Sequence, residues 1–228
     1  MQPHPAPLSM VLPARPSLPE SVRRGRVVVI IRGDYNHTHM PALAEVLREA
    51  GLLAVEVTAN SPNAADCIAS LSAEPGLEVG AGTVLDLETA NRLLNAGARF
   101  LVTPNVDPAL IRAAADDGVP VMPGAFTPTE VIRAWQAGAA AVKLFPADVL
   151  GPTFVSALQG PVPDIPLIPT GGISDSTAQA YLDAGAVAVA VAPWLIPRRA
   201  SDLDLDQVRR RAWSLSRAVA NSTHTEGD

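Results

Sequence analysis

Residues 138–146 read GAAAVKLFP, in which a glycine opens an apolar run that contains one lysine and ends at a proline. The same order, a glycine followed by an apolar run, recurs along the chain. The glycines that begin these segments are Gly51, Gly76, Gly97, Gly118, Gly138, Gly160 and Gly185. Their spacings are 25, 21, 21, 20, 22 and 25 residues. A glycine just after a helix is typical of a left-handed helix end, and a repeat of about 22 residues fits one short strand, one short helix and two tight loops.

This repeat predicts eight strands, each followed by a helix, because a further apolar run precedes the first of these glycines. We place the strands at residues 27–32, 53–59, 78–84, 100–105, 119–124, 140–146, 165–170 and 187–192. Strands that are apolar along their whole length are covered on both faces, which for parallel strands means helices outside and a packed interior. We therefore predict an α/β fold with a single domain, a (β/α)8 TIM barrel over residues 25–222. The alternative is an open doubly wound sheet, but IIRGDYNH after the first strand lacks the dinucleotide-binding glycines.

The two ends of the chain differ from the repeating part. Residues 1–24 contain six prolines and little periodicity, so we expect a loosely ordered N-terminal extension with a short helix near residues 17–24. Residues 223–228 are expected to form a flexible C-terminal tail.

Composition excludes several classes of partner. The net charge of −6 argues against binding to nucleic acid or to an anionic membrane surface. The single cysteine, Cys67, rules out an internal disulfide, fits a reducing compartment, and is expected to be buried on a helix face. No apolar run reaches the ~18 residues of a membrane-spanning helix, and the N-terminus lacks the apolar region of a signal peptide. We therefore expect a cytoplasmic protein.

Two charged residues stand inside predicted strands, where charge is expensive. Lys143 lies within AVKLF and Glu56 within LLAVEVTANS. An active site in such a barrel lies at the carboxyl ends of the strands, so the two side chains can meet across its mouth. They form either a buried ion pair of structural value only, or a catalytic pair in which Lys143 attacks a carbonyl to form a Schiff base and Glu56 transfers protons.

Other strand ends supply candidate binding groups. Arg32 ends the first strand and has a planar guanidinium that suits a carboxylate. Thr83 follows two glycines in GAGT, where the backbone can approach a ligand closely. Gly171 and Gly172 in IPTGGI offer backbone N–H groups at the position where barrels often bind phosphate. The segment after the eighth strand contributes less, because Pro193 has no N–H to donate.

Two further patterns are interpreted as structural. His37 and His39 fall in a polar turn with no third ligand nearby, so we predict no metal site there. The arginines of DQVRRRAW are expected to form a solvated helix face near Asp204 and Asp206, with Trp213 packed inward.

Six motifs, taken in order, resemble the 2-keto-3-deoxy-6-phosphogluconate and 4-hydroxy-2-oxoglutarate aldolase family over residues 26 to about 200. They are VEVT at 55–58, GAGTV at 80–84, LVTPN at 101–105, VMPG at 121–124, VKLFPA at 142–147 and PTGGI at 169–173. The resemblance implies a (β/α)8 barrel and a class I aldolase that needs no metal or other cofactor. It further implies a homotrimer that acts on a small-molecule substrate and releases pyruvate and an aldehyde such as glyceraldehyde 3-phosphate.

The resemblance also assigns roles by motif. Lys143 matches the Schiff-base lysine and Glu56 the proton-transfer glutamate. Residues that match the pyruvate site are Thr83 and Pro104, and those that match the loop near the phosphate are Thr170, Gly171 and Gly172.

The chain departs from the family pattern at two places. Asn60 stands where gluconate-type members commonly carry a carboxylate-binding arginine four residues after the glutamate. The stretch TANSP, the motif VTPN and the pair Gly151 and Pro152 resemble the 2-keto-3-deoxy-6-phosphogalactonate branch, in which the arginine matched by Arg32 contacts substrate. The second departure is VAPWL at 191–195 in place of GGSWL, which removes donors expected at a phosphate.

Three hypotheses follow from these residues. The first is a retro-aldol lyase that cleaves a 2-keto-3-deoxy-6-phospho sugar acid of gluconate or galactonate type. The second keeps the iminium but takes 4-hydroxy-2-oxoglutarate or another unphosphorylated keto acid. The third is a barrel without activity that binds a sugar acid.

Overall fold

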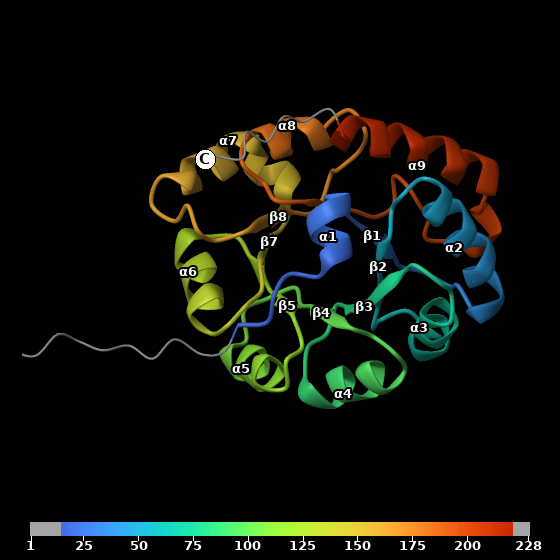
Figure 1. The fold of residues 1–228 in the computed structure, drawn as a ribbon, viewed down its shortest axis with the longest axis horizontal. Helices are drawn as coiled ribbons and strands as arrows, with labels where there is room; N and C mark the ends of the chain where they lie inside the picture. The colour runs from blue at the N-terminus through green and yellow to red at the C-terminus, as the bar shows by residue number, and fades with distance from the viewer. Residues whose placement is uncertain (1–14, 221–228) are drawn as a thin grey trace, which may run out of the picture.

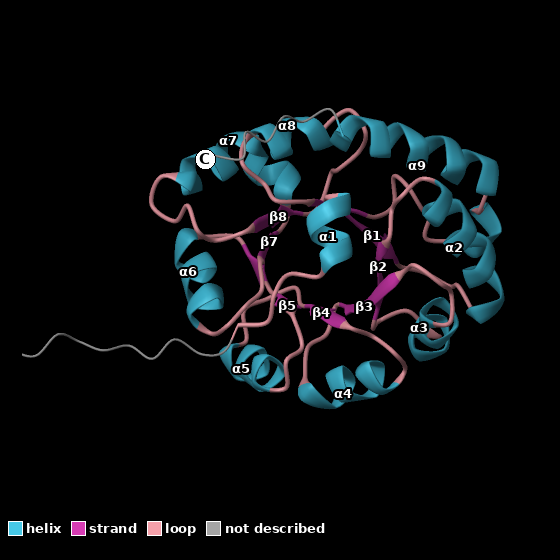
Figure 2. Cartoon of the chain, viewed as in Figure 1, coloured by secondary structure: helices cyan, strands magenta, loops and turns pink. Residues whose placement is uncertain are grey.

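The computed structural model describes residues 15–220, so the expected C-terminal tail and the first part of the extension, residues 1–14, lie outside the described residues. Parallel strands form a ring, and helices surround it (Figures 1 and 2). The strands are β1 (Val27–Ile31), β2 (Ala54–Thr58), β3 (Glu78–Gly82), β4 (Phe100–Val102), β5 (Val121–Met122), β6 (Gly124–Ala125), β7 (Val142–Leu144), β8 (Leu167–Pro169) and β9 (Val189–Val191).

The pairing of these strands confirms the predicted TIM barrel. One sheet has the order β5-β4-β3-β2-β1-β9 and the other β6-β7-β8, and all pairs are parallel. A bridge between Thr170 and Ala190 joins β8 to β9. The predicted fifth strand is present as β5 and β6, which Pro123 separates because it has no N–H for the ladder. The ring therefore closes with eight strand positions.

The helices alternate with the strands as the repeat predicts. They are α2 (Met40–Glu49), α3 (Ala64–Ser72), α4 (Leu87–Asn95), α5 (Pro108–Asp116), α6 (Pro128–Gln136), α7 (Ala147–Gln159), α8 (Ala178–Asp183) and α9 (Leu205–Ala220), with short 3-10 turns η1 (His37–His39) and η2 (Ala200–Asp202). Side chains of Asp86, Asp107 and Thr127 accept hydrogen bonds from the first turns of α4, α5 and α6. Such caps satisfy backbone donors that have no partner inside the helix, which fixes where these helices begin.

Side chains alternate along the strands between an inner and an outer core. On β1, Val28 and Ile30 face the inside of the barrel, whereas Val27, Val29 and Ile31 pack against the helices. Glu56 pairs in register with Ile30, so it also lies on the inner side. The period of two along a strand thus points the predicted glutamate into the barrel.

A helix before the barrel closes its amino-terminal end. Helix α1 (Glu20–Gly25) lies across the centre of the ring in Figure 1, and its Val22 is fully buried in the inner core with Val28 and Phe100. The short helix expected near residues 17–24 is therefore present. It is packed rather than loosely ordered, because Val22 fills the space inside the ring.

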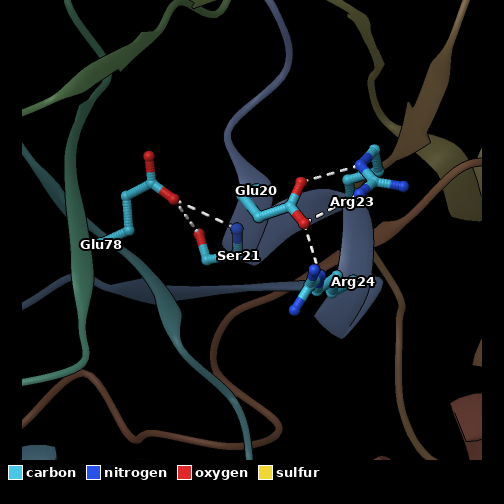
Figure 3. A network of polar contacts seen from close by, with 5 residues as sticks. All are labelled: Glu20, Ser21, Arg23, Arg24 and Glu78. Atoms are coloured by element: carbon cyan, nitrogen blue, oxygen red, sulfur yellow. Dashed lines mark hydrogen bonds and ion pairs between the residues drawn. The ribbon is translucent and has the colours of Figure 1, made fainter.

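Glu78, the first residue of β3, holds this helix in place (Figure 3). Its Oε2 accepts hydrogen bonds from the backbone N of Ser21 at 3.1 Å and from Ser21 Oγ at 2.6 Å. The N-cap residue of α1 is Pro19, which provides no side-chain acceptor. Glu78 therefore takes the place of a helix cap from another part of the chain.

Replacing Glu78 with alanine is expected to lower the free energy of unfolding by about 1 to 2 kcal/mol, because two donors of Ser21 lose their acceptor. Urea denaturation would measure this loss. Glu20→Ala is the matched control, because Glu20 pairs with Arg23 and Arg24 on the exposed side of the same helix (Figure 3) and should matter less. Equal losses in the two variants would contradict the capping role.

The final helix corrects one prediction from the sequence. Trp213 was expected to pack inward, but 46% of it is exposed. The buried residues of α9 are Val208, Ala212, Leu215 and Val219, a spacing of four, three and four. Because Trp213 follows Ala212, it lies about 100° around the helix from that stripe. Among the described residues, no helix is long and apolar enough to cross a membrane.

Candidate active site

Glu56 and Lys143 come together at the mouth of the barrel. Both side chains are buried, with 1% of Glu56 and 5% of Lys143 exposed. They line the same small internal space, together with Ile30, Met122 and Thr170. Glu56 comes from β2 and Lys143 from β7, so the closed ring is what brings the two charged groups together.

The Glu56 carboxyl group is buried, and neither of its oxygens has a hydrogen-bond partner among residues 15–220. Burial raises its pKa, while the positive charges of Lys143 and Arg32 act in the opposite direction. Gly82 on β3 leaves room for this group, because a Cβ atom at that position would overlap Glu56 Oε1. Burying a carboxyl group without hydrogen-bond partners costs free energy. Proteins often keep such costly groups at sites where they act on a bound ligand.

Lys143 is an amine whose charged form is disfavoured. Burial lowers its pKa, Glu56 opposes this effect, and the positive charge of Arg32 adds to it. Within residues 15–220, no carboxylate lies within 4.0 Å of its ammonium group, although its Nζ lies 5.1 Å from the centre of the Phe145 ring. The alternative of a closed buried ion pair is therefore wrong for this structure. The arrangement favours a neutral amine, which is the nucleophilic form.

Arg32 and Thr83 form a second group beside this pair. Arg32 Nη2 donates a hydrogen bond to Thr83 Oγ1 at 3.0 Å, and Arg32 Nε is buried with no partner in the described part of the chain. Thr83 has a φ of 56°, a left-handed conformation that is rare for a β-branched residue. Strain of this kind gathers at functional sites. The guanidinium thus keeps a donor free for a ligand carboxylate.

A cleft of about 210 Å³ reaches Arg32 and Lys143. Its lining includes Arg32, Lys143, Phe145, Thr170, Gly171 and Gly172. Thr170 is buried and its Oγ1 donates to the carbonyl of Ile168 at 3.2 Å. Both glycines have positive φ, 104° and 68°, so the turn that they form needs residues without a side chain.

Pro104 and Thr83 do not line the cleft themselves but lie next to residues that are near it or line it. The carbonyl oxygen of Pro104 would be 2.5 Å from a Cβ atom at Gly124, and Gly124 pairs with Lys143 in register. Pro104 therefore lies against β6, the strand next to the one that carries Lys143, and Thr83 is linked to the cleft through its hydrogen bond with Arg32. The cleft also includes Ile196 and Arg198, which were not singled out in the sequence because they lie five or more residues beyond β9.

The two histidines belong to a turn rather than to this site. His37 and His39 form η1, and His39 Nδ1 accepts a hydrogen bond from the backbone N of Asn36 at 3.3 Å. In the part of the chain that the structure describes, no group of three or more His, Cys, Asp or Glu side chains is placed to hold a metal ion.

Comparison with known proteins identifies the family to which the chain is similar. The KDPG and KHG aldolase family matches residues 18–211. The 2-dehydro-3-deoxy-phosphogluconate aldolase of Pseudomonas aeruginosa is 38% identical over 191 residues, covering 82% of this chain and 86% of that protein. A probable 2-dehydro-3-deoxy-6-phosphogalactonate aldolase of Rhizobium meliloti is 40% identical over 162 residues, covering 70% and 76%. A solved structure described as native KDPGal superposes with a TM-score of 0.80 at 29% identity, covering 86% of this chain and 95% of that one. The chain therefore belongs to the KDPG and KHG aldolase family.

Proposed function

We propose that this protein is a class I aldolase that cleaves a 2-keto-3-deoxy-6-phospho sugar acid into pyruvate and glyceraldehyde 3-phosphate. The observation that carries the proposal is the buried Lys143 amine, with its lowered pKa, beside the unpartnered carboxyl group of Glu56. Relatives from both the gluconate and the galactonate branch support this substrate class.

Lys143 is the nucleophile in this mechanism. Its neutral amine adds to the C2 carbonyl carbon, and the resulting carbinolamine loses water to give an iminium ion. The Glu56 carboxylate removes the proton of the C4 hydroxyl group, and a C4=O bond forms as the C3–C4 bond breaks. The electron pair of the C3–C4 bond moves toward the iminium nitrogen. The aldehyde leaves and an enamine of pyruvate remains on Lys143.

Glu56 moves the protons in these steps. Its raised pKa brings the carboxyl group closer to neutral pH, where a general acid and base works best. It returns a proton to C3 of the enamine, and water then hydrolyses the iminium to release pyruvate. Because no described residue forms a hydrogen bond with the carboxyl group, both of its oxygens are available for this transfer.

Arg32 binds the substrate carboxylate in this proposal. Asn60 cannot supply a charge, whereas Arg32 lines the cleft beside Lys143 and has a free buried Nε donor. Its hydrogen bond to Thr83 holds the guanidinium plane in place. The carboxylate contact thus comes from the residue that directly follows β1.

Cleavage assays test the proposed reaction. The 6-phospho forms of 2-keto-3-deoxygluconate and 2-keto-3-deoxygalactonate would each be supplied, and pyruvate release followed with lactate dehydrogenase. Turnover of at least one of them is expected. Turnover of neither would contradict the proposed function.

A second substrate class is favoured by one specific feature. Ala192 and Pro193, which directly follow β9, offer fewer phosphate donors than a glycine and a serine would. This supports 4-hydroxy-2-oxoglutarate or another unphosphorylated keto acid as the alternative. Release of pyruvate from 4-hydroxy-2-oxoglutarate at a higher kcat/KM than from both phosphorylated acids would favour it.

We also propose a homotrimer. Large apolar side chains are exposed on segments that follow the carboxyl ends of strands, and they are Leu85, Leu87, Phe126, Phe145 and Val149. Exposed apolar side chains gathered at one end of a protein mark an interface, and here second and third copies of the chain would cover them. Light scattering would report three chain masses, and one chain mass would contradict the proposal.

A further inference from the structure

We propose that Arg198 is the specificity-determining residue that binds the anionic group at the far end of the substrate, the C6 phosphate. This inference rests on the proposed aldolase activity and adds to it the residue that distinguishes phosphorylated from unphosphorylated substrates. Arg198 is exposed and lines the cleft that leads down to the buried Lys143.

The loop after β9 cannot hold a phosphate by its backbone alone. Pro193 has no N–H group, and Ala192 has no hydroxyl group. The N–H groups of Leu195 and Ile196 both donate to the carbonyl oxygen of Ala192, at 3.0 and 3.2 Å. These donors are used within the turn, so an anion at this place needs another partner.

Arg198 is the cation left for that purpose. Cationic side chains that line the cleft are Arg32, Lys143 and Arg198, and the adjoining hollow of about 360 Å³ along Gly171, Pro193 and Trp194 adds no other. Arg32 is assigned to the substrate carboxylate and donates its Nη2 to Thr83, and Lys143 is the nucleophile at the inner end. Within residues 15–220, no carboxylate lies within 4.0 Å of the Arg198 guanidinium.

The carboxylate of Asp148 lies near the place where the phosphate would bind, so a cation would be needed to offset its repulsion. Asp148 in the first turn of α7 lies against the glycine turn, with its Oδ1 3.4 Å from the position of a Cβ atom at Gly171. A phosphate bound to the N–H groups of this turn would face that carboxylate. The guanidinium of Arg198 would offset the repulsion and supply bidentate hydrogen bonds.

The backbone of Arg198 is fixed over the loop that follows β1. Its carbonyl oxygen accepts a hydrogen bond from the N of Asp34 at 3.3 Å, and the buried Tyr35 donates its hydroxyl to the carbonyl of Pro197 at 2.6 Å. A Cβ atom at Gly33 would overlap the Arg198 carbonyl, so only glycine permits this approach. The loop that carries Arg198 is thereby held beside the loop after β1, which begins with Arg32.

Substitution of Arg198 tests the inference through substrate selectivity. The ratio of kcat/KM for the phosphorylated sugar acid to that for the same acid without phosphate is measured in wild type, Arg198→Ala and Arg198→Lys. R198A is expected to lower this ratio by about 10- to 100-fold, mainly through a higher KM for the phosphorylated acid, because a charged hydrogen bond is lost. R198K should restore part of the ratio.

Arg199→Ala is the matched control, because Arg199 is the exposed neighbour and does not line the cleft. R199A should keep the wild-type ratio. An R198A variant that keeps the ratio, or one that loses kcat/KM equally on both acids, would overturn the inference. A wild-type enzyme that cleaves both acids equally well would also overturn the inference. A different result would refute the proposed function itself: a wild-type protein that cleaves neither acid and forms no adduct with pyruvate after borohydride reduction.

Discussion

Replacing Lys143 with methionine is expected to reduce pyruvate release by more than about 10⁴-fold, because a thioether cannot form the iminium on which every later step depends. Methionine keeps an unbranched side chain of similar length and packs well in apolar surroundings. The loss should therefore reflect chemistry rather than misfolding. Steady-state assays with the phosphorylated keto acids measure it.

The same variant is expected to be more stable than the wild type. Burial lowers the pKa of Lys143 even though Glu56 opposes the effect, so the charged amine is held at a cost in free energy. Removing it should raise the free energy of unfolding by about 1 to 3 kcal/mol, measured by urea denaturation. Lys143→Arg is the matched control, because it places a permanent cation at this position and should lose cleavage without this gain. K143M with activity near the wild-type level would contradict the assigned role.

Replacing Glu56 with glutamine is expected to lower kcat by about 10²- to 10⁴-fold, because the amide has nearly the same shape but cannot transfer a proton. Exchange of the methyl protons of pyruvate with deuterium, followed by NMR, should fall by a similar factor. Glu78→Gln is the matched control, because Glu78 opens β3 at the opposite end of the barrel and should leave exchange unchanged. Exchange at the wild-type rate in E56Q would exclude Glu56 as the proton carrier.

Glu56 also predicts a pH dependence of stability. Burial raises its folded-state pKa above the ordinary value of 4.5, so the folded protein binds this proton more tightly than the unfolded chain does. The contribution to stability is fully present below pH 4.5 and is lost as the pH rises through the folded-state pKa. The wild type should therefore gain stability relative to E56Q between about pH 8 and about pH 4. A constant difference over this range would contradict the raised pKa.

The barrel could be predicted from the sequence because its signals are local. Glycines at helix ends and apolar runs repeat at nearly equal distances, and each unit needs only one strand and one helix. The break between β5 and β6 follows from the missing N–H of Pro123. Which strand residues this break separates depends on strand register, which is a property of the closed ring. The packing of α1 was not predictable, because Val22 is one apolar residue in a proline-rich segment and its partners lie on distant strands.

The site was predictable where a charged residue interrupts an apolar strand. Glu56 and Lys143 were found in this way, and the structure brings both to one space. Thr83 gave no sign of its positive φ, since GAGT does not reveal the conformation of its threonine. Arg198 was missed because its place at the cleft depends on Gly33 and Tyr35, which lie more than 160 residues earlier.

Trapping of pyruvate with borohydride tests the iminium on Lys143 most directly. The protein is incubated with pyruvate, reduced, and analysed by intact mass and peptide mapping, with a known class I aldolase treated in parallel. One pyruvyl-sized adduct on the peptide that contains Lys143 is the predicted result. An unmodified protein, when the parallel aldolase is trapped, would contradict the proposed mechanism.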